Sequence, residues 1–353
     1  MRKEGAMQPV PFGSTGLMTP PLIFGSTALG NLFREFSYES KLETMRAIIA
    51  RLPKPVVIDS AGKYGAGLAL EVMGDCLREL GVDDDGVIIS NKLAWLRAPL
   101  TTPEPTFEPG AWFGLEHDAV QDISYAGIRK CFEQGLELLG GDYSTQLVSV
   151  HDPDEYLDTA ESPADRERRF DDILGAYTAL GELKATGQAK GIGVGAKNWR
   201  SIAEIDAHVA LDWVMFANSY TLYSHPADLL DFMDSLQAKG VAIINSAVFN
   251  AGFLTGGEFF NYVKLDPANP EHQEKFAWRE KFFALCEQHG QVPSEVCIQF
   301  GKSHPGIVAL ALSTSRPERV KTNVDAMSVE APAAFWNVLK EEGLLAEDHT
   351  YIR

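Results

Sequence analysis

The sequence predicts a closed barrel of eight parallel β-strands, each followed by a helix, in a single domain. Short apolar runs rich in β-branched residues alternate eight times with longer segments of helical periodicity. Strands that alternate with helices pair in parallel through right-handed crossovers, and eight such units close a (β/α)8, or TIM, barrel. The 353 residues, 45% of them hydrophobic, suffice for this fold and contain no Pro/Ser-rich linker that would divide them.

The first half of the chain supplies an N-terminal arm and four strand–helix units. Residues 1–18 are expected to form the arm, because Gly13 and Gly16 are turn signals. The run Val-Val-Ile that opens the second strand is too short and too β-branched for a convincing helix. The four expected strands, each with its following helix, are Leu22–Gly25 with Lys41–Leu52, Val56–Ala61 with Leu68–Leu80, Val87–Lys92 with Tyr125–Leu139, and Gln146–His151 with Phe170–Ala185.

The second half repeats the alternation and ends in a tail, residues 328–353. The expected units are Gly191–Gly195 with Ser201–Val209, Trp213–Asn218 with Leu229–Ala238, Ala242–Asn245 with Glu274–His289 and Ser294–Lys302, and Ile307–Leu312 with Pro317–Met327. The competing fold, an open doubly wound sheet, usually carries G-x-G-x-x-G after an early strand. Gly191–Gly195 offers only G-x-G-x-G, inside a strand of the second half, so the barrel is favoured.

Composition excludes several classes of partner. The net charge of −18 argues against nucleic acid and against an anionic membrane surface, because both are bound by clustered Lys and Arg. A single anionic ligand remains compatible, since a few local cations and helix N-termini could hold it. The N-terminal region has no apolar signal segment and the four cysteines form no C-x-x-C pair, so we expect a cytoplasmic protein with buried free thiols.

Four polar side chains end or follow three consecutive predicted strands. Asp59 lies in the second strand and Tyr64 follows it, while Lys92 ends the third strand and His151 ends the fourth. In such a barrel, chemistry lies at the C-terminal ends of the strands. A capping aspartate, a packing tyrosine, a snorkelling lysine and a core histidine would each be ordinary alone. Together they predict one site in which all four side chains converge.

The four residue types suit proton transfer by a phenol. Tyrosine titrates near 10 and is a poor base at neutral pH. An ammonium about 4 Å away, at an effective dielectric of about 20, is worth roughly 4 kcal/mol, or about three pK units. We therefore expect Lys92 to lower the pKa of Tyr64, Asp59 to keep Lys92 charged, and His151 to orient the substrate oxygen.

Other kinds of site find less support. A metal centre from His151, Asp152 and Asp154 would need further ligands at other strand ends, and none of the eight histidines forms an H-x-H pair. We therefore expect no metal. The chain also lacks a G-x-S-x-G elbow and a G-x-x-x-x-G-K-[ST] phosphate loop.

The segment Asp59–Gly65, D-S-A-G-K-Y-G, resembles the motif D-T-A-x-x-Y-G of aldo-keto reductases, with a lysine and a histidine at family-like distances. The resemblance extends from about Phe12 to Met327. Ile192–Trp199 is similar to the family's I-G-V-S-N-F segment, with extra residues at its turn. Ala251–Gly256 resembles the loop after the seventh strand, and Arg319–Asn323 resembles the cofactor-binding R-x-x-x-N.

The resemblance implies a nicotinamide cofactor lying across the barrel mouth without a Rossmann domain, and Tyr64 as the proton donor or acceptor. The loop Gly252–His272 could fold over this cofactor. Phosphate-preferring members commonly carry a lysine where this chain has Ser313, so NAD is expected to serve at least as well as NADP. The implied cofactor-binding residues are Asn198 as a replacement carboxamide contact, Asn218, Ser246, Gly252, Leu254, Ser313, Thr314, Arg319, Thr322 and Asn323.

Within the family, the opening F-G-S-T-A-L-G-N-L-F-R and the I-G-V-G-x-x-x-W segment are similar to D-threo-aldose 1-dehydrogenases, including fucose and galactose dehydrogenases. This implies oxidation of a fucose-, galactose- or arabinose-like hemiacetal at C1 to the lactone, with Tyr64 as general base. Two alternatives stay open: turnover of another carbonyl or alcohol such as pyridoxal, and a slow cofactor-binding regulatory subunit like those of potassium channels. A homo-oligomer is compatible with the sequence.

Overall fold

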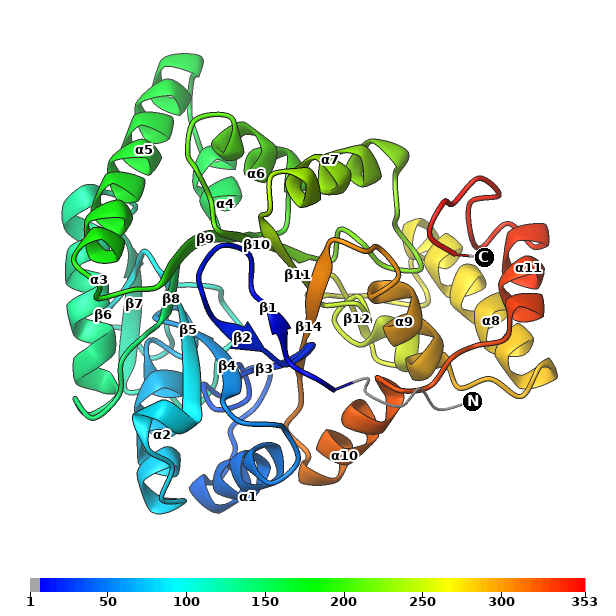
Figure 1. Ribbon diagram of the computed structural model, residues 1–353, viewed down its shortest axis with the longest axis horizontal. Coiled ribbons are helices and arrows are strands. Elements are labelled where there is room, and N and C mark those ends of the chain that lie inside the picture. Colours follow the sequence, from blue (N-terminus) through cyan, green and yellow to red (C-terminus); the bar gives the residue numbers. More distant parts are fainter. Residues whose placement is uncertain (1–6, 353) are drawn as a thin grey trace.

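The computed structural model describes residues 7–352, in which eight parallel strands form a closed barrel surrounded by helices (Figure 1). The last strand pairs with the first and closes the barrel. The fold class and all eight strands predicted from the sequence are confirmed. The barrel strands are β3 (Leu22–Gly25), β4 (Val56–Ala61), β5 (Val87–Leu93), β8 (Leu147–His151), β9 (Gly191–Ala196), β10 (Trp213–Ala217), β11 (Ala242–Ser246) and β14 (Ile307–Ser313).

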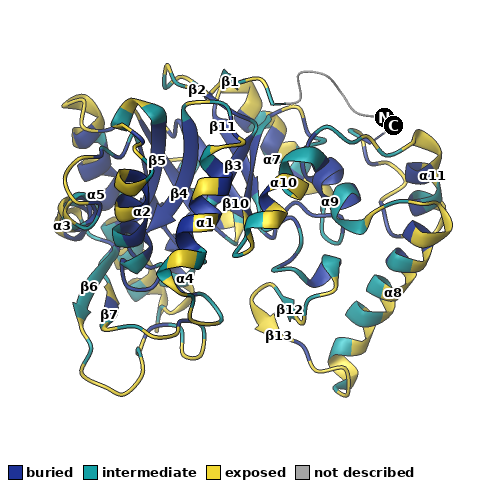
Figure 2. Cartoon of the chain, turned by 90° about the horizontal axis from the view of Figure 1, so that it is seen from below, coloured by how far each residue is buried: buried dark blue, intermediate teal, exposed yellow. Residues whose placement is uncertain are grey.

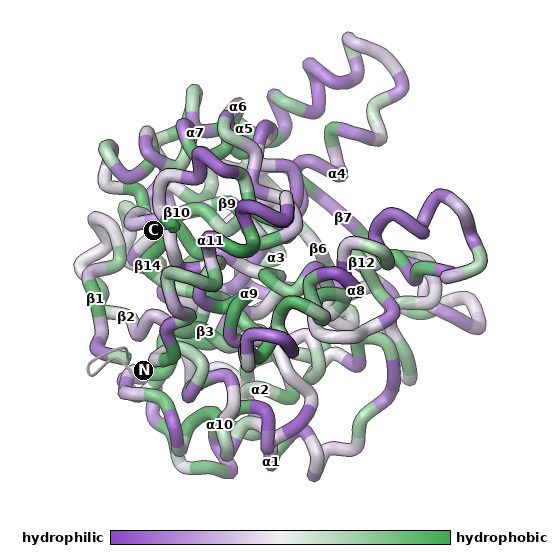
Figure 3. The backbone as a smooth tube through the Cα atoms, turned by 90° about the vertical axis from the view of Figure 1, so that its right-hand side faces the viewer, coloured by the Kyte–Doolittle hydropathy of each residue, from purple (hydrophilic) through white to green (hydrophobic). Residues whose placement is uncertain are grey.

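The helices cover the outside of the barrel, and their apolar faces pack on the strands. Figure 3 shows hydrophobic segments gathered around the barrel and hydrophilic ones on the projecting outer parts. The helices are α1 (Tyr38–Ile49), α2 (Leu68–Glu79), α3 (Tyr125–Leu138), α4 (Pro153–Asp158), α5 (Pro163–Ala185), α6 (Trp199–Asp206), α7 (Ala227–Ala238), α8 (Gln273–Gln288), α9 (Pro293–Gly301), α10 (Pro317–Ala326) and α11 (Ala333–Glu341).

The described part of the N-terminal arm closes one end of the barrel. Strands β1 (Val10–Pro11) and β2 (Met18–Thr19) of the predicted arm pair antiparallel as a hairpin, whereas residues 1–6 of this arm lie outside the described residues. Phe12 is fully buried in the cluster inside the barrel, with its ring 6.3 Å from that of Trp213. The arm therefore plugs the barrel with an aromatic side chain.

The alternating glycines of β9 make room inside the barrel. A Cβ atom at Gly193 would lie 2.4 Å from the indole of Trp213, and one at Gly195 would lie 2.8 Å from Cδ of Lys92. Such distances require a neighbour to shift, so these two positions accommodate only a hydrogen as side chain without rearrangement. The G-x-G-x-G pattern thus provides space for Trp213 and Lys92.

Two hairpins extend the end of the barrel opposite the arm (Figure 2). The loop after β5 folds back as β6 (Trp95–Pro99) and β7 (His117–Gln121), and the loop after β11 carries β12 (Phe259–Phe260) and β13 (Val263–Lys264). The ring of Phe259 stacks on Phe33, from the loop after β3, at a centroid distance of 4.3 Å. The hairpins therefore build walls around the strand ends where the predicted site lies.

Several helix boundaries differ from those expected. Helix α5 begins at Pro163 rather than near Phe170, because Ser162 caps it and accepts a hydrogen bond from the Asp165 backbone N–H. The tail, whose last residue Arg353 lies outside the described residues, contains α11 with Trp336 buried against the core. Within residues 7–352, no helix has the length and apolarity needed to cross a membrane. All four cysteines are buried and free, as predicted.

Candidate active site

The four predicted catalytic side chains come together at the C-terminal ends of β4, β5 and β8. Asp59 and Lys92 are almost fully buried and form an ion pair. The Lys92 ammonium lies 4.8 Å from the centre of the Tyr64 ring. The rings of Tyr64 and His151 meet edge-on, with centroids 5.6 Å apart. The convergence inferred from the strand ends is therefore present in the structure.

Close backbone packing fixes the turn that presents Tyr64. Gly65 adopts a positive φ of 62°, and a Cβ atom there would lie 2.4 Å from the carbonyl oxygen of Gly30. Only glycine combines this backbone angle with so close an approach. The turn after β4 is thereby packed against the loop after β3, which places the phenol beside the strand ends.

A network of partners holds Asp59 and Lys92 in place. The Ser90 hydroxyl donates to Asp59 Oδ1 at 3.0 Å, while Lys92 Nζ donates to the other carboxylate oxygen and to the Ser60 carbonyl at 3.2 Å. Both side chains are 3–4% exposed. Burial of two opposite charges is tolerated because each has a partner and further hydrogen bonds.

The expected lowering of the Tyr64 pKa is wrong for the protein alone. Burial raises the pKa of Tyr64 well above its ordinary value, and the negative charges of Asp59, Asp152 and Glu108 raise it further. Lys92 does not reverse this effect because its charge is matched by Asp59 at direct contact. Tyr64 is therefore held as the neutral phenol, the form that donates a proton.

His151 is a neutral imidazole in this site. Burial lowers its pKa well below the ordinary value, and the positive charges of Lys92 and Lys63 lower it further. Nε2 lies 3.6 Å from Asp152 Oδ2, and Nδ1 is buried without a hydrogen-bond partner. A neutral imidazole can donate one hydrogen bond to a substrate oxygen without adding charge.

Sequence reasoning missed a second group of charges beside these four residues. Lys63, which precedes Tyr64, places its ammonium 2.7 Å from Asp152 Oδ2, 2.7 Å from Glu108 Oε1 and 3.0 Å from Glu155 Oε2. Burial lowers the pKa of Lys63, but these three carboxylates more than reverse that effect and raise it. The only signal was the lysine in D-S-A-G-K-Y-G, because Glu108 lies in a loop whose course the sequence does not reveal.

The two aspartates weighed as metal ligands have other roles. Asp152 binds Lys63, and Asp154 Oδ2 accepts the backbone N–H groups of Lys197 and Asn198 at 2.9 and 2.7 Å. Among residues 7–352, no three His, Cys, Asp or Glu side chains are grouped as metal ligands would be.

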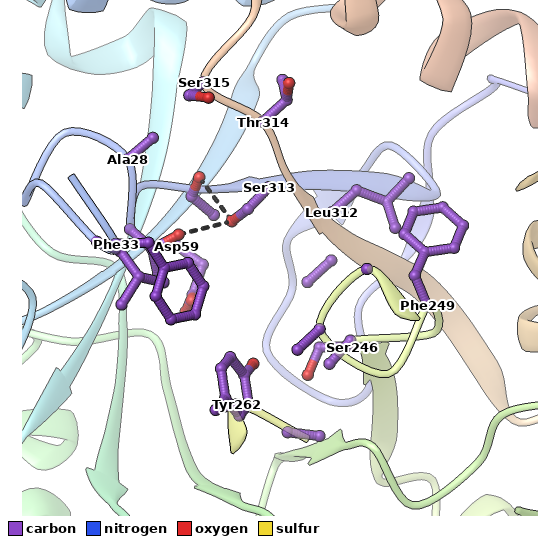
Figure 4. A pocket seen from close by; sticks show the side chains of 18 of the residues that line it. Ala28, Phe33, Asp59, Ser246, Phe249, Tyr262, Leu312, Ser313, Thr314 and Ser315 are labelled. Atoms are coloured by element: carbon purple, nitrogen blue, oxygen red, sulfur yellow. Dashed lines mark hydrogen bonds between the residues drawn. The ribbon is translucent and has the colours of Figure 1, made fainter. Parts of the chain in front are cut away.

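A cavity of about 1050 Å³ runs from the catalytic side chains to the N-terminal end of α10. Figure 4 shows Phe33 and Ser246 on opposite sides of the cavity, with Ser313 and Thr314 from the end of β14 at its upper edge. Arg316 was not predicted and also lines it. The predicted residues that line it are Asp59, Tyr64, Lys92, His151, Ser246, Gly252, Ser313, Thr314, Arg319, Thr322 and Asn323.

Three predicted cofactor residues do not line this cavity. Asn198 caps α6, with its side-chain oxygen accepting the Arg200 backbone N–H, and its contact with a carboxamide stays a prediction. Leu254 is fully buried in the core. Asn218 follows the cavity residue Ala217 in the chain, and its backbone N–H donates to the carbonyl of Ser246, which also lines the cavity.

The residues present fit a nicotinamide dinucleotide. Both amide atoms of the Asn218 side chain, next to the lining residues Ala217 and Ser246, are buried without a partner, a costly arrangement that a carboxamide reaching them from the cavity would relieve. At the far end, Ser313 and Thr314 lead into the N-terminus of α10, where backbone N–H groups and the helix dipole favour phosphate oxygens. Arg316 and Arg319 add two cations there.

Several known proteins are similar to this chain over nearly its whole length. The chain is 28% identical over 346 residues to pyridoxal 4-dehydrogenase of Microbacterium luteolum, covering 95% of this chain and 97% of that protein. It is 26% identical over 341 residues to D-threo-aldose 1-dehydrogenase of a Pseudomonas species, covering 94% and 96%. The glycerol dehydrogenase of Gluconobacter oxydans shares the fold, with a TM-score of 0.68 at 16% identity and coverage of 99% and 100%.

The sequence model of one protein family matches the part of the chain that forms the whole barrel. The matched region runs from residue 21, just before β3, to residue 342, just after α11. It therefore includes all eight barrel strands, the four converging side chains and the cavity. This match shows that the chain belongs to the Aldo/keto reductase family and is an NAD(P)-dependent oxidoreductase.

Proposed function

We propose that the protein oxidises an aldose at its anomeric carbon, converting the cyclic hemiacetal to a lactone. The observation that carries this proposal is the convergence of Tyr64, Lys92, Asp59 and His151 beside one large cavity. The resemblance to the Pseudomonas D-threo-aldose 1-dehydrogenase supports a sugar as substrate. When bound, NAD or NADP supplies the acceptor for the hydride that leaves C1.

Each of the four converging side chains has its own role in the transfer of one proton. Tyr64 takes the proton of the C1 hydroxyl as the hydride leaves, and His151 donates a hydrogen bond to the same oxygen and orients it. Lys92 places a positive charge beside the Tyr64 phenolate, which is the form that accepts this proton, and Asp59 fixes the position of Lys92. The lactone then leaves with a neutral ring oxygen and no remaining hydroxyl at C1.

The cavity wall offers a suitable surface for a sugar ring. Trp112 is buried, lines the cavity and has its ring centroid 5.9 Å from that of Tyr64. Its Nε1 donates to Glu108 at 2.7 Å, which fixes the orientation of the indole. An aromatic face of this kind contacts the C–H surface of a sugar while the hydroxyls reach polar groups.

We assign the cofactor to the rest of the cavity. Asn218 would hold the nicotinamide carboxamide, and Ser246, with Gly252 in the loop after β11, would border the pyrophosphate. The adenosine end would lie on residues from the end of β14, the following turn and α10, namely Ser313, Thr314, Arg316, Arg319, Thr322 and Asn323.

A second candidate function is reduction of an aldehyde or ketone. The observation that favours it is the raised pKa of Tyr64, because a neutral phenol is already the form that donates a proton to a carbonyl oxygen. The relative named for pyridoxal points to an aromatic aldehyde or alcohol as the corresponding substrate class.

A substrate panel separates the two candidates. Purified protein would be assayed by nicotinamide absorbance with NAD and NADP against D- and L-aldoses, with pyridoxal, and in reverse with simple aldehydes. The aldose proposal predicts that one stereochemical group of aldoses has the highest kcat/KM and yields a lactone by chromatography. Faster turnover of pyridoxal or of simple aldehydes than of every aldose would overturn it.

A further inference from the structure

Five charged side chains form one wall of the cavity next to the catalytic residues, and we call them the charged wall. Lys63 follows β4, Glu108 lies between β6 and β7, Asp152 and Glu155 follow β8, and Lys197 follows β9. Four of them line the cavity, while Glu155 bridges the two lysines from behind. Residues far apart in sequence thus converge on one surface.

The charged wall is continuous with the catalytic site. Asp152 accepts the Lys63 ammonium at 2.7 Å and lies 3.6 Å from Nε2 of His151. At the other side, Glu108 joins Lys63 to the Trp112 indole, which lies beside Tyr64. A substrate whose reacting oxygen contacts Tyr64 and His151 would therefore have its neighbouring groups against this wall.

The arrangement is costly for the fold, which argues for a use beyond packing. The side chains of Lys63 and Asp152 are only 3% and 7% exposed. Asp152 and Glu108 both adopt left-handed backbone, with φ of 51° and 45°, which is unfavourable for residues other than glycine. Strain of this kind concentrates at binding and catalytic sites.

The charges on the wall do not cancel. Two ammonium groups face three carboxylates, leaving one negative charge in excess, and the neighbouring Lys92–Asp59 pair adds no net charge. The cavity's arginines, Arg316 and Arg319, lie at its opposite end beside α10. The substrate end therefore attracts hydrogen-bond donors and cations and repels anions.

We propose that the charged wall is a specificity subsite that accepts neutral, hydroxyl-rich or cationic substrates and rejects substrates carrying a carboxylate or phosphate. This inference rests on the proposed function, since it places the substrate in the same cavity. Sugar hydroxyls would donate to the carboxylates of Glu108 and Asp152, and Lys63 and Lys197 would donate to hydroxyl oxygens. Uronic acids and sugar phosphates would bring a like charge to the wall.

The test uses three benzaldehydes of similar shape, carrying a para carboxylate, a hydroxymethyl or a trimethylammonium group. Their reduction would be compared as kcat/KM at fixed salt. We expect the carboxylate to be at least about tenfold poorer than the hydroxymethyl compound, because like charges in contact are strongly disfavoured. The trimethylammonium compound should be at least as good as the neutral one. Equal values for anion and neutral compound would overturn the proposal.

Two substitutions of opposite sign separate charge recognition from a structural role. Glu108→Gln removes a negative charge and should weaken discrimination against the carboxylate, whereas Lys197→Gln removes a positive charge and should strengthen it. Glu137→Gln removes an exposed charge from α3 and should leave the ratio unchanged. A merely structural wall would move the ratio in the same direction for both cavity variants, which would contradict the proposal.

The outcomes distinguish this inference from the proposed function. Aldose oxidation without charge discrimination would overturn the subsite proposal alone. Charge discrimination among the aldehydes without any aldose oxidation would overturn the aldose assignment alone. If none of the aldehydes is reduced, calorimetry would instead measure the dissociation constants of the three corresponding benzyl alcohols. The ratio of the constants for the anionic and the neutral alcohol would then report the same charge discrimination. Equal dissociation constants would then overturn the proposal.

Discussion

The ammonium of Lys92 lies 4.8 Å from the centre of the Tyr64 ring while its charge is matched by Asp59 at direct contact. This relationship decides how the phenol behaves. A free ammonium at that distance would lower the pKa of Tyr64, but a neutralised one leaves burial as the dominant effect, and burial raises it. The neutral phenol is therefore the resting form, and the phenolate forms only at alkaline pH in the protein alone.

The pH dependence of the two reaction directions should differ. Reduction uses the protonated phenol, so its rate should stay constant across neutral pH and fall only where Tyr64 ionises, above its ordinary pKa. Oxidation uses the phenolate, so its rate should rise with pH through the neutral and alkaline range. Because the pKa of His151 is lowered, no inflection is expected near 6.5. Rate profiles in both directions would check this, and an oxidation plateau beginning near neutral pH would contradict it.

Asp59→Asn should destabilise the protein strongly. The substitution leaves the Lys92 ammonium buried without its counter-charge, and breaking a buried pair by removing one partner costs about 3–5 kcal/mol. Denaturant unfolding would measure the change in the free energy of unfolding. Asp228→Asn is the matched control, because its pair with Arg200 is more than half exposed and is worth at most about 1 kcal/mol. Equal effects of the two substitutions would show that the Asp59–Lys92 pair is unimportant for stability.

Gly195→Ala should impair catalysis through the position of Lys92. The added methyl group would lie 2.8 Å from Lys92 Cδ, so the lysine side chain must shift from its present position beside Tyr64 and Asp59. We expect kcat to fall by at least about tenfold, since small misplacements at a reacting centre are costly. Gly181→Ala on α5 meets no atom within 4 Å and should raise stability by roughly 0.5–1 kcal/mol without loss of activity. Unchanged kcat in Gly195→Ala would show that this contact does not position Lys92.

The choice of cofactor should respond to charge at Ser313. Its hydroxyl donates to the Gly25 carbonyl at 3.1 Å and accepts from Thr27 at 3.2 Å, so it offers no cation to a ribose phosphate. We expect NAD to serve at least as well as NADP, and Ser313→Lys to shift the kcat/KM ratio toward NADP by about tenfold. Thr186→Lys adds the same charge at the C-cap of α5, outside the cavity lining, and should not shift this ratio. A wild-type preference for NADP above about a hundredfold, or about 2.7 kcal/mol, would contradict this expectation and show that Arg316 and Arg319 suffice to bind the ribose phosphate.

The barrel and the convergence of the four candidate catalytic side chains could be predicted because they depend on local patterns. Each strand is an apolar β-branched run, and a parallel barrel brings all strand ends to one face. Asp59, Lys92 and His151 therefore had to lie near each other once the strands were recognised.

Other features depend on contacts that no local pattern encodes. The charged wall draws Glu108 from a loop whose hairpin strands contain only five residues each, and helix α11 is stabilised by burying Phe335 and Trp336 on the core. The pKa of Tyr64 follows first from its burial and then from the negative charge of Asp59, which matches that of Lys92. The helix cap that Asn198 forms on α6 was likewise not evident from the sequence.

The most direct test of the central claim is turnover by Tyr64→Phe beside the wild type, with the aldose that the panel identifies. The ring and its packing remain while the exchanging proton is lost, so kcat should fall by at least about 10²–10⁴-fold. Cofactor binding, followed by quenching of tryptophan fluorescence, should stay near the wild-type value. Near-normal turnover by Tyr64→Phe would contradict the assignment of Tyr64 as the group that exchanges the proton.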